Sequence, residues 1–167
     1  MNAGAFGASI SDSLDFVTVF NVKKGKSEIL FKKDCDFSYR HSIFAQKRDF
    51  IILSANFKMP FAPCEQIREG MRYALSVRTE RHPTALPSAG SVFLKHAGKS
   101  AGELIESAGL MGESIGGAAV SLKHAGFIVN LGGATAKDVL SLVERVKTRV
   151  YEKHGVELKT EIEYIDN

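Results

Sequence analysis

Alternating hydrophobic and polar positions dominate the first third of the chain. Residues 15–31, DFVTVFNVKKGKSEILF, contain two runs rich in β-branched and aromatic residues on either side of the polar turn KKGK. This arrangement is typical of a β-hairpin. Residues 48–59, RDFIILSANFKM, predict a further strand that ends before Pro60 and Pro63. We therefore predict a β-rich first region.

The pattern changes to a helical period at Cys64. From there to about Thr79, hydrophobic side chains recur at intervals of three and four residues, which predicts a helix. Pro83 and Pro87 follow and favour an extended link. We expect this helix at the border between two folding units, residues 1–60 and 61–167.

The rest of the chain has the pattern of a second unit. The most amphipathic segment, residues 135–155, predicts a helix that Thr135 caps and Gly155 ends. A shorter helix is predicted from Ser100 to Gly109, with Glu103 completing a capping box. We expect strands at 91–95 (SVFLK), 116–122 (GGAAVSL), 126–132 (GFIVNLG) and 156–165 (VELKTEIEYI). The resulting order, βαββαβ, predicts an α+β domain with its helices packed on one face of a mainly antiparallel sheet.

Composition and charge exclude several classes of protein. The net charge is +3, and lysine and arginine form only short runs without interleaved aromatics, which disfavours a nucleic-acid binder. Cys35 and Cys64 are isolated, so we predict no metal site and a reducing compartment. No apolar run reaches the roughly 18 residues that span a bilayer, and residues 1–12 lack the features of a signal peptide. We therefore expect a cytoplasmic protein that does not bind membranes.

Taken singly, the candidate functional residues are weak. Ser91 follows Gly90 in the sequence AGSVF, which is not the G-x-S-x-G elbow of serine hydrolases, and the histidines show no obvious order relative to it. An ordinary turn serine is therefore favoured on this pattern alone. Arg40 in YRHSIF suits a carboxylate or a phosphate as well as a surface ion pair. Glu161 and Lys123 occupy positions where solvated charges are common.

The first residues have the composition of a loop. NAGAFG, residues 2–7, contains successive small residues whose backbone N–H groups can converge on an anion, although plain tight turns have the same composition. Domains rarely open inside such a loop, so we expect that further polypeptide precedes it; the alternative is a flexible chain terminus.

Together these segments resemble one family. MNAGAFG, YRHSIF, PSAGSVF, the long block from AGELIESAG to GGATAKDV, and GVELKTEIEYI are similar, in this order, to the UDP-N-acetylenolpyruvoylglucosamine reductase (MurB) family. The resemblance covers essentially all 167 residues, and PSAGSVF and KHAGFIVN are its most specific blocks. The spacing between Arg40 and Ser91 is similar to that of the shorter subtype, which lacks an inserted tyrosine-bearing loop.

The resemblance implies a cytoplasmic flavoenzyme of peptidoglycan synthesis. NADPH would reduce FAD, and the reduced flavin would pass hydride to the enolpyruvyl group of a UDP-sugar, giving UDP-N-acetylmuramate. Residues 1–60 would be the C-terminal half of the FAD-binding domain, and residues 61–167 the substrate-binding domain. The N-terminal FAD-binding lobe of the family is not part of the sequence, so the resemblance implies it as a partner and implies that the isolated chain binds FAD poorly. The alternative is a non-catalytic UDP-sugar-binding module.

The resemblance also assigns roles to individual residues. Ser91 matches the proton donor, and Arg40 and Glu161 match the active-site arginine and glutamate. The remaining implied contacts are Asn2, Ala3, Gly4 and Ala5 for the cofactor, and Tyr39, Lys95 and Lys123 for the substrate. No histidine base is needed, because a hydroxyl can protonate a strongly basic carbanion directly.

Three positions depart from the family pattern. Leu94 stands where a lysine is usual, His82 replaces a glutamine and Gly133 replaces an asparagine. The change at Leu94 affects an expected contact with the substrate phosphates, which Lys95 would partly replace.

Overall fold

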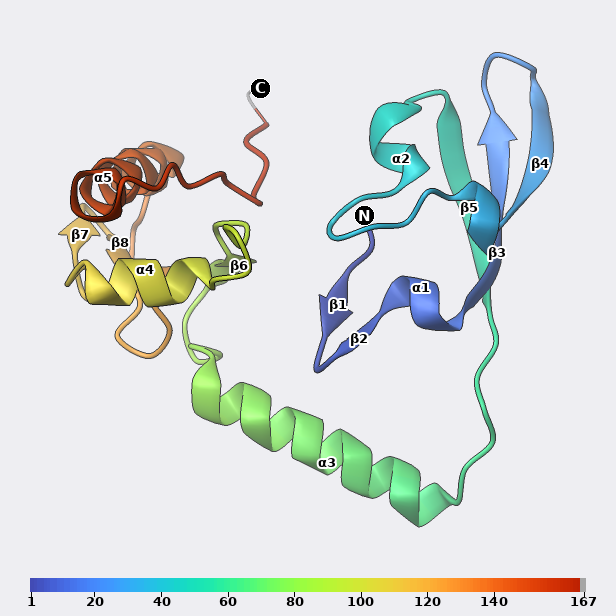
Figure 1. Cartoon of the computed structure of the whole chain (residues 1–167), viewed down its shortest axis with the longest axis horizontal. Helices are drawn as coiled ribbons and strands as arrows, with labels where there is room; N and C mark the ends of the chain where they lie inside the picture. The colour runs from blue at the N-terminus through green and yellow to red at the C-terminus, as the bar shows by residue number, and fades with distance from the viewer. Residues whose placement is uncertain (166–167) are drawn as a thin grey trace. The chain divides into compact units, whose positions relative to one another are not determined.

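The computed structural model describes residues 1–165, which form two compact units. The N-terminal unit is Met1–Met71 and the C-terminal unit begins at Arg72. The division falls inside α3 (Cys64–Arg81), the long green helix of Figure 1, so the helix predicted at the border contains it.

The N-terminal unit is built on a three-stranded antiparallel sheet with the order β4-β3-β5. Its elements are β1 (Gly4–Ala5), β2 (Ala8–Ser9), α1 (Ile10–Ser13), β3 (Leu14–Asn21), β4 (Lys26–Phe31), the 3₁₀ helix η1 (Lys32–Asp34), α2 (Ile43–Gln46) and β5 (Phe50–Phe57). The predicted hairpin is confirmed as β3 and β4, and the predicted third strand as β5. The central strand β3 provides most of the core.

The core of this unit is small. Leu14, Val17, Val19 and Cys35 are its fully buried hydrophobic residues, and four partly buried side chains pack around them. Burial is the main reason that the pKa of the Cys35 thiol is raised, with the neighbouring Asp34 carboxylate adding to the effect.

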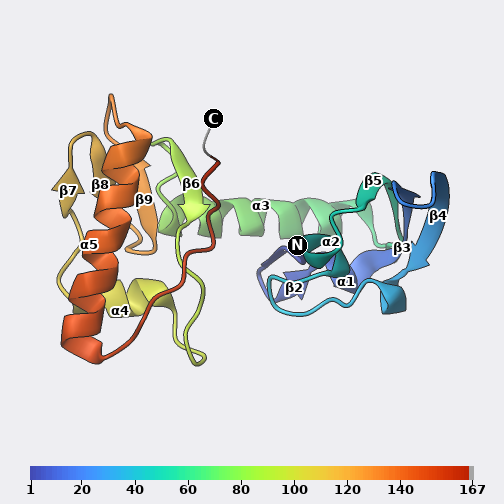
Figure 2. The ribbon, with the colours of Figure 1, turned by 90° about the horizontal axis from the view of Figure 1, so that it is seen from above.

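The C-terminal unit has a four-stranded antiparallel sheet with the order β6-β9-β8-β7. Its elements are β6 (Ser88–Ser91), α4 (Ala101–Ser107), β7 (Ser114–Ile115), β8 (Ala118–Val120), β9 (Phe127–Asn130) and α5 (Ala136–His154). Figure 2 shows β7, β8 and β9 side by side with α5 running across them. The expected mixture of helices with an antiparallel sheet is therefore confirmed.

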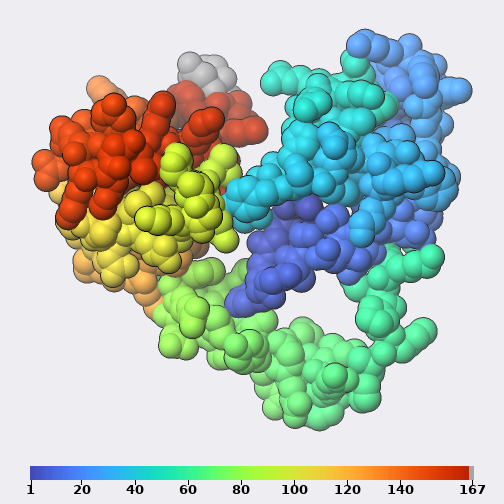
Figure 3. All heavy atoms as spheres, viewed as in Figure 1, coloured from blue at the N-terminus to red at the C-terminus, as the bar shows by residue number. Residues whose placement is uncertain are grey.

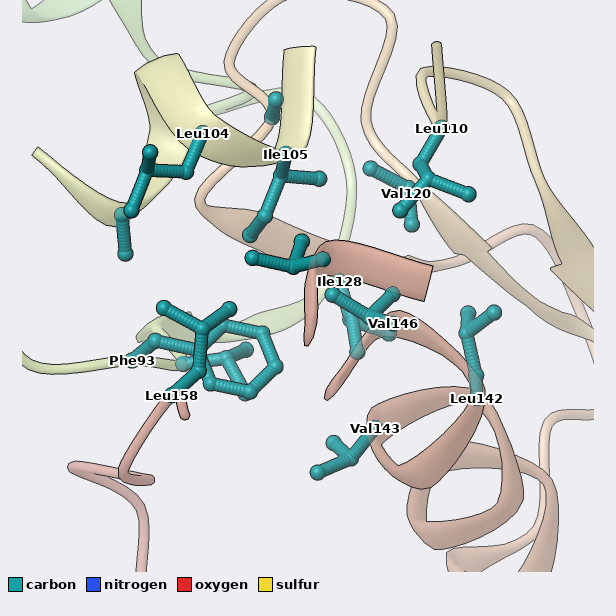
Figure 4. Packing of buried hydrophobic residues seen from close by; sticks show 14 of the residues in the cluster. Phe93, Leu104, Ile105, Leu110, Val120, Ile128, Leu142, Val143, Val146 and Leu158 are labelled. Carbon is teal, nitrogen blue, oxygen red and sulfur yellow. The ribbon is translucent and has the colours of Figure 1, made fainter. Parts of the chain in front are cut away.

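Both helices contribute to one core. In Figure 3 the yellow atoms of α4 lie against the orange-red atoms of α5, and the two helices are in contact. Figure 4 shows Ile105 of α4, Val146 of α5 and Leu158 converging with side chains from the sheet. The cluster contains fifteen buried hydrophobic residues, so this unit has a filled interior of its own.

Helix α5 begins and ends as its sequence predicts. The Thr135 hydroxyl accepts a hydrogen bond from the Asp138 N–H (3.1 Å), and the Asp138 carboxylate accepts one from the Thr135 N–H (2.9 Å). That second bond lowers the pKa of Asp138. Gly155 ends the helix with a φ of 65°, which a residue with a side chain rarely adopts.

Three local predictions are wrong. The strand expected at 91–95 lies at Ser88–Ser91 instead, because the chain leaves the sheet edge after Ser91. The strand expected at 156–165 is only an isolated antiparallel bridge between Phe93 and Thr160, because this segment buries Leu158 in the helical core and does not join the sheet. The order is therefore not a complete βαββαβ. Ser100 precedes α4, but its carbonyl, and not its hydroxyl, accepts the bond from the Leu104 N–H (3.5 Å).

Candidate functional site

Ser91 is the exposed last residue of β6. Its cross-strand partner is Phe127 of β9, and a register shift separates this pair from the pair of Ser88 with Val129. Cross-strand partners point to the same face of a sheet, and the neighbour of Phe127, Ile128, points into the helical core. The Ser91 side chain therefore belongs to the face that α4 and α5 do not cover.

Gly126 brings the Ser91 hydroxyl and the His124 ring to one place. A Cβ on Gly126 would lie 3.0 Å from Cε1 of His124 and 3.7 Å from Oγ of Ser91, so both side chains lie close to the backbone of this glycine. The Gly126 N–H donates to Nδ1 of His124 (3.1 Å), which fixes the ring. A larger residue at position 126 would displace the imidazole.

Two further rings complete this cluster. The His82 ring centroid is 5.4 Å from that of His124 and 5.1 Å from that of Phe127, and the His124 and Phe127 centroids are 4.9 Å apart. Burial lowers the pKa of His82, and the nearby charges of His124 and Arg78 lower it further. Both effects favour the uncharged form of His82.

Glu161 lies in the segment that runs beside the exit from β6. Its N–H donates to the carbonyl of Val92 (2.7 Å), and the Leu94 N–H donates to the carbonyl of Lys159 (2.9 Å). The half-buried Glu161 is therefore placed opposite the residue that follows Ser91. The structure brings these two predicted site residues into neighbouring segments.

The two predicted substrate-binding lysines have different surroundings. Nζ of Lys123 donates to the carbonyl of Thr79 (2.6 Å). Lys95 is exposed in the turn after Phe93, which closes through a bridge between His96 and Lys99. Each ammonium group lies on the surface of the C-terminal unit.

Two hollows flank the cluster. The first, about 430 Å³, is mainly apolar, and Ala119 and Val129 of the sheet form part of its lining together with Leu86 and Leu131. The second, about 380 Å³, has charged side chains of both signs. Its lining includes Glu80, Arg81, Glu103, Glu106, Lys123 and His124. The apolar hollow thus lies over the open face of the sheet, whereas the polar hollow lies beside α4, and Lys123 is part of the lining of both.

In the N-terminal unit, Arg40 lies against the glycine-containing hairpin. A Cβ on Gly4 would lie 2.9 Å from the Ala8 carbonyl oxygen and 3.7 Å from Nη1 of Arg40, so the close approach of the hairpin strands depends on the missing side chain. The Arg40 guanidinium also lies 5.2 Å from the centre of the Tyr39 ring. Two motifs that are separate in the sequence are therefore adjacent in this unit.

Asn2 has a supporting role in this hairpin. Its Nδ2 donates to Oγ of Ser11 (3.1 Å) and to the carbonyl of Ser38 (3.4 Å), and its Oδ1 accepts from the Ser11 N–H (3.0 Å). The buried amide therefore ties three segments together. Ala3 and Ala5 are exposed beside it and leave the backbone accessible.

Within residues 1–165, no three histidine, cysteine, aspartate or glutamate side chains are arranged to hold a metal ion. The same residues contain no helix that is long and apolar enough to cross a membrane.

The sequence of the C-terminal unit decides the family. The model for the UDP-N-acetylenolpyruvoylglucosamine reductase C-terminal domain matches residues 82–165, which is just over half of the chain. The chain belongs to the UDP-N-acetylenolpyruvoylglucosamine reductase family. The resemblance found from the sequence motifs is thus confirmed.

Individual reductases match nearly the whole chain. It is 45% identical over 162 residues to the UDP-N-acetylenolpyruvoylglucosamine reductase of Shouchella clausii, covering 97% of this chain and 51% of the relative. The reductase of Listeria innocua is 44% identical over 165 residues, covering 99% and 55%. The crystal structure of the Thermus caldophilus reductase (MurB) superimposes with a TM-score of 0.81 at 37% identity, covering 96% of this chain and 57% of that one. The chain spans about half the length of the curated relatives it matches.

Proposed function

We propose that this chain supplies the proton-donating part of a UDP-N-acetylenolpyruvoylglucosamine reductase and belongs to a cytoplasmic enzyme of peptidoglycan synthesis. Its family membership and the names of its relatives support the reaction class. One observation carries the assignment to residues: Ser91 ends a strand on the open face of the sheet, and the Glu161 segment is hydrogen-bonded to the residue that follows it.

The proposed role of Ser91 follows from the chemistry of the substrate. A flavin held by residues 2–5 and reduced by NADPH would supply a hydride to the methylene carbon of the enolpyruvyl group. The electron pair of the double bond then moves to the carbon beside the carboxylate, where it forms a strong base. The Ser91 hydroxyl, held at the end of β6, gives its proton to that carbon, and UDP-N-acetylmuramate results.

The charge that develops next to the carboxylate needs stabilisation. We assign this to Arg40, whose guanidinium pairs with the negative charge, and to Glu161, which interacts by hydrogen bonding. Tyr39, Lys95 and Lys123 are the proposed contacts for the rest of the UDP-sugar. Lysine ammonium groups suit its diphosphate, because they offer several donors to one anion.

The flavin contact is proposed for Asn2, Ala3, Gly4 and Ala5. The hairpin fits a flat or anionic group, because its small residues expose the backbone and the guanidinium of Arg40 lies against Gly4. The side chain of Asn2 would act indirectly, by holding the hairpin in shape. In this proposal residues 1–60 are part of a flavin-binding domain, and the complete flavin site needs a further lobe.

The test uses this chain co-expressed with the unmatched part of the Shouchella clausii reductase. Ser91→Ala is expected to slow product formation by about 10²–10⁴-fold, the usual contribution of a general acid. Flavin reduction by NADPH, followed separately by its absorbance, should be unchanged. Ser88→Ala, in the same strand, is the matched control and should leave both half-reactions intact.

Equal loss of both half-reactions in Ser91→Ala would assign Ser91 a structural role and contradict the proposal. The alternative function of the chain, a UDP-sugar-binding module without catalysis, predicts a different outcome. Calorimetry would then show UDP-sugar binding by a complex that contains no flavin and forms no product.

A further inference from the structure

The loop that carries Arg40 is strained at two residues. Arg40 has a backbone φ of 52° and Asp36 has a φ of 48°, both in the left-handed region that residues with a side chain rarely adopt. Aspartate tolerates this region better than most residues, whereas arginine has no such preference. A strained conformation persists only where the surrounding contacts hold it. The contacts within this loop therefore determine where the guanidinium of Arg40 lies.

Tyr39 and Arg40 form the tip of this loop. The residues on either side of them, Ser38 and His41, form an antiparallel bridge in which each N–H donates to the carbonyl of the other (3.3 and 3.2 Å). At the tip, Nη1 of Arg40 approaches the hairpin and lies 3.7 Å from the position that a Cβ on Gly4 would take. A change in the shape of the tip would therefore move the guanidinium away from the hairpin.

One side-chain contact connects the tip to the other strained residue of the loop. Nε2 of His41 lies 3.2 Å from Oδ2 of Asp36. An ionised carboxylate can only accept a hydrogen bond, so the imidazole is the donor and carries a hydrogen on Nε2 whether or not the ring is charged. The residue that follows Arg40 is thus bonded to Asp36, the second residue in the left-handed region.

The pair of Asp36 and His41 is poorly placed to stabilise the whole unit. The Asp36 side chain is 73% exposed and the His41 side chain is 28% exposed. Exposed pairs of this kind contribute little to the free energy of unfolding. The effect of the pair is local, because it closes one short loop in which two residues have an unfavourable backbone conformation. The pair is therefore better suited to positioning a side chain than to stabilising the fold.

We propose that the Asp36–His41 pair is a positioning device for Arg40: it holds the loop tip so that the guanidinium stays beside the hairpin at Gly4. This inference rests on the proposed function, in which Arg40 stabilises the negative charge that develops beside the substrate carboxylate. A guanidinium that is fixed in advance stabilises this charge without rearranging during the reaction. Neither residue of the pair touches the substrate in this proposal.

The test compares two replacements of His41 in the complex of this chain with the unmatched part of the Shouchella clausii reductase. His41→Gln keeps an N–H donor near the place of Nε2, whereas His41→Leu keeps the bulk and removes the donor. His41→Leu should lower kcat for product formation about tenfold, because the guanidinium is no longer held in the reactive geometry. The KM for the UDP-sugar should change less than about twofold, because the lost interaction belongs to the transition state. His41→Gln should restore most of the rate.

Two controls accompany these rates. Flavin reduction by NADPH should be unchanged in both variants, because Arg40 is assigned to the later half-reaction. Asp49→Asn breaks the ion pair between Asp49 and Lys23 (2.7 Å) in the same unit, and is the matched control for the loss of a surface pair. It should leave the rates of both half-reactions unchanged.

A second readout does not depend on turnover. Nuclear magnetic relaxation of the backbone amides of Tyr39 and Arg40, in the same complex, reports the motion of the loop tip on the picosecond to nanosecond timescale. Their order parameters should fall below about 0.6, the range of flexible backbone, in His41→Leu and stay near the wild-type values in His41→Gln. The amides of β3 are the internal reference and should not change.

Three outcomes would overturn the proposal. The first is a tip that stays rigid in His41→Leu. The second is an equal loss of rate in His41→Gln and His41→Leu, which would assign His41 a role through the shape of its ring. The third is a mobile tip with an unchanged kcat in His41→Leu, while Arg40→Ala lowers kcat. Unchanged product formation in Arg40→Ala would instead contradict the proposed function, and the relaxation measurement alone would then decide whether the pair holds the loop.

Discussion

The two units of this protein bury hydrophobic surface to different extents. In the C-terminal unit, α4 and α5 fill one side of the sheet and bury fifteen hydrophobic residues. In the N-terminal unit, four hydrophobic residues are fully buried, and the hydrophobic strand β5 is exposed along nearly its whole length. A hydrophobic sheet therefore has a core only where other elements cover it.

The comparison also separates the proposed site residues. Ser91 and Glu161 belong to the unit with the filled core, where the neighbouring residues Val92 and Phe93 are buried and hold the backbone. The proposed flavin contacts belong to the unit that has exposed hydrophobic surface. We therefore expect the positions of Ser91 and Glu161 to be set by this chain alone, and the proposed flavin side to depend on the further lobe.

The largest expected effect is a difference in stability cost when the same substitution, isoleucine to alanine, is made in each of the two units. Ile105→Ala removes a fully buried side chain of the C-terminal core and should cost about 3 kcal/mol. Ile51→Ala, in exposed β5, should cost less than about 0.5 kcal/mol in the chain alone. Native-state hydrogen exchange would measure the free energy of opening of each unit, through the amides of α4 for Ile105→Ala and those of β3 for Ile51→Ala. Similar costs at the two positions would show that the isolated N-terminal unit buries β5.

A smaller effect is expected at the two helix starts of the C-terminal unit. Thr135→Ala removes a hydroxyl that accepts the Asp138 N–H and should cost about 1 kcal/mol. Ser100→Ala removes a hydroxyl that makes no capping bond to α4, so its cost should be clearly lower. Chemical unfolding followed by circular dichroism would compare them. A larger loss in Ser100→Ala would contradict the assigned cap geometry.

The smallest effect concerns pH. Burial lowers the pKa of His82 in the folded chain below its ordinary value of 6.5, whereas the unfolded chain keeps that value. The unfolded state therefore binds the proton more tightly, and stability falls as the pH drops through 6.5 towards the folded pKa. His82→Gln should reduce this loss.

The measurement is the free energy of unfolding at about pH 7.5 and about pH 5, in the wild type and in the variant, so that other titrating groups cancel. His154→Gln, at a histidine that bonds to Ser107 (2.9 Å) away from the cluster, is the control. An unchanged pH dependence in His82→Gln would mean that His82 is not kept neutral by the fold.

Local patterns predicted much of this structure. The hairpin of β3 and β4, the helix from Cys64 and the capped helix α5 all follow from periodicity, turn residues and caps within each segment. Such signals act over a few residues and do not require a particular tertiary context, and α3 forms even though none of its residues is buried. The motifs that singled out Ser91, Arg40 and Glu161 are likewise short.

Contacts between distant segments explain the features that local patterns did not predict. The alternation of hydrophobic and polar residues in 156–165 predicts a strand. In the structure, Leu158 packs into the helical core, and the segment forms only the bridge between Thr160 and Phe93. His124 reaches the neighbourhood of Ser91 because β6 pairs with β9, and Arg40 reaches Gly4 because two loops pack together. Contacts of this kind depend on chain segments that are distant in sequence, and no local pattern encodes which of them meet. Local sequence was thus sufficient for the helices, the hairpin and the family, whereas contacts between distant segments set the ends of β6, prevented a strand at 156–165 and brought the site side chains together.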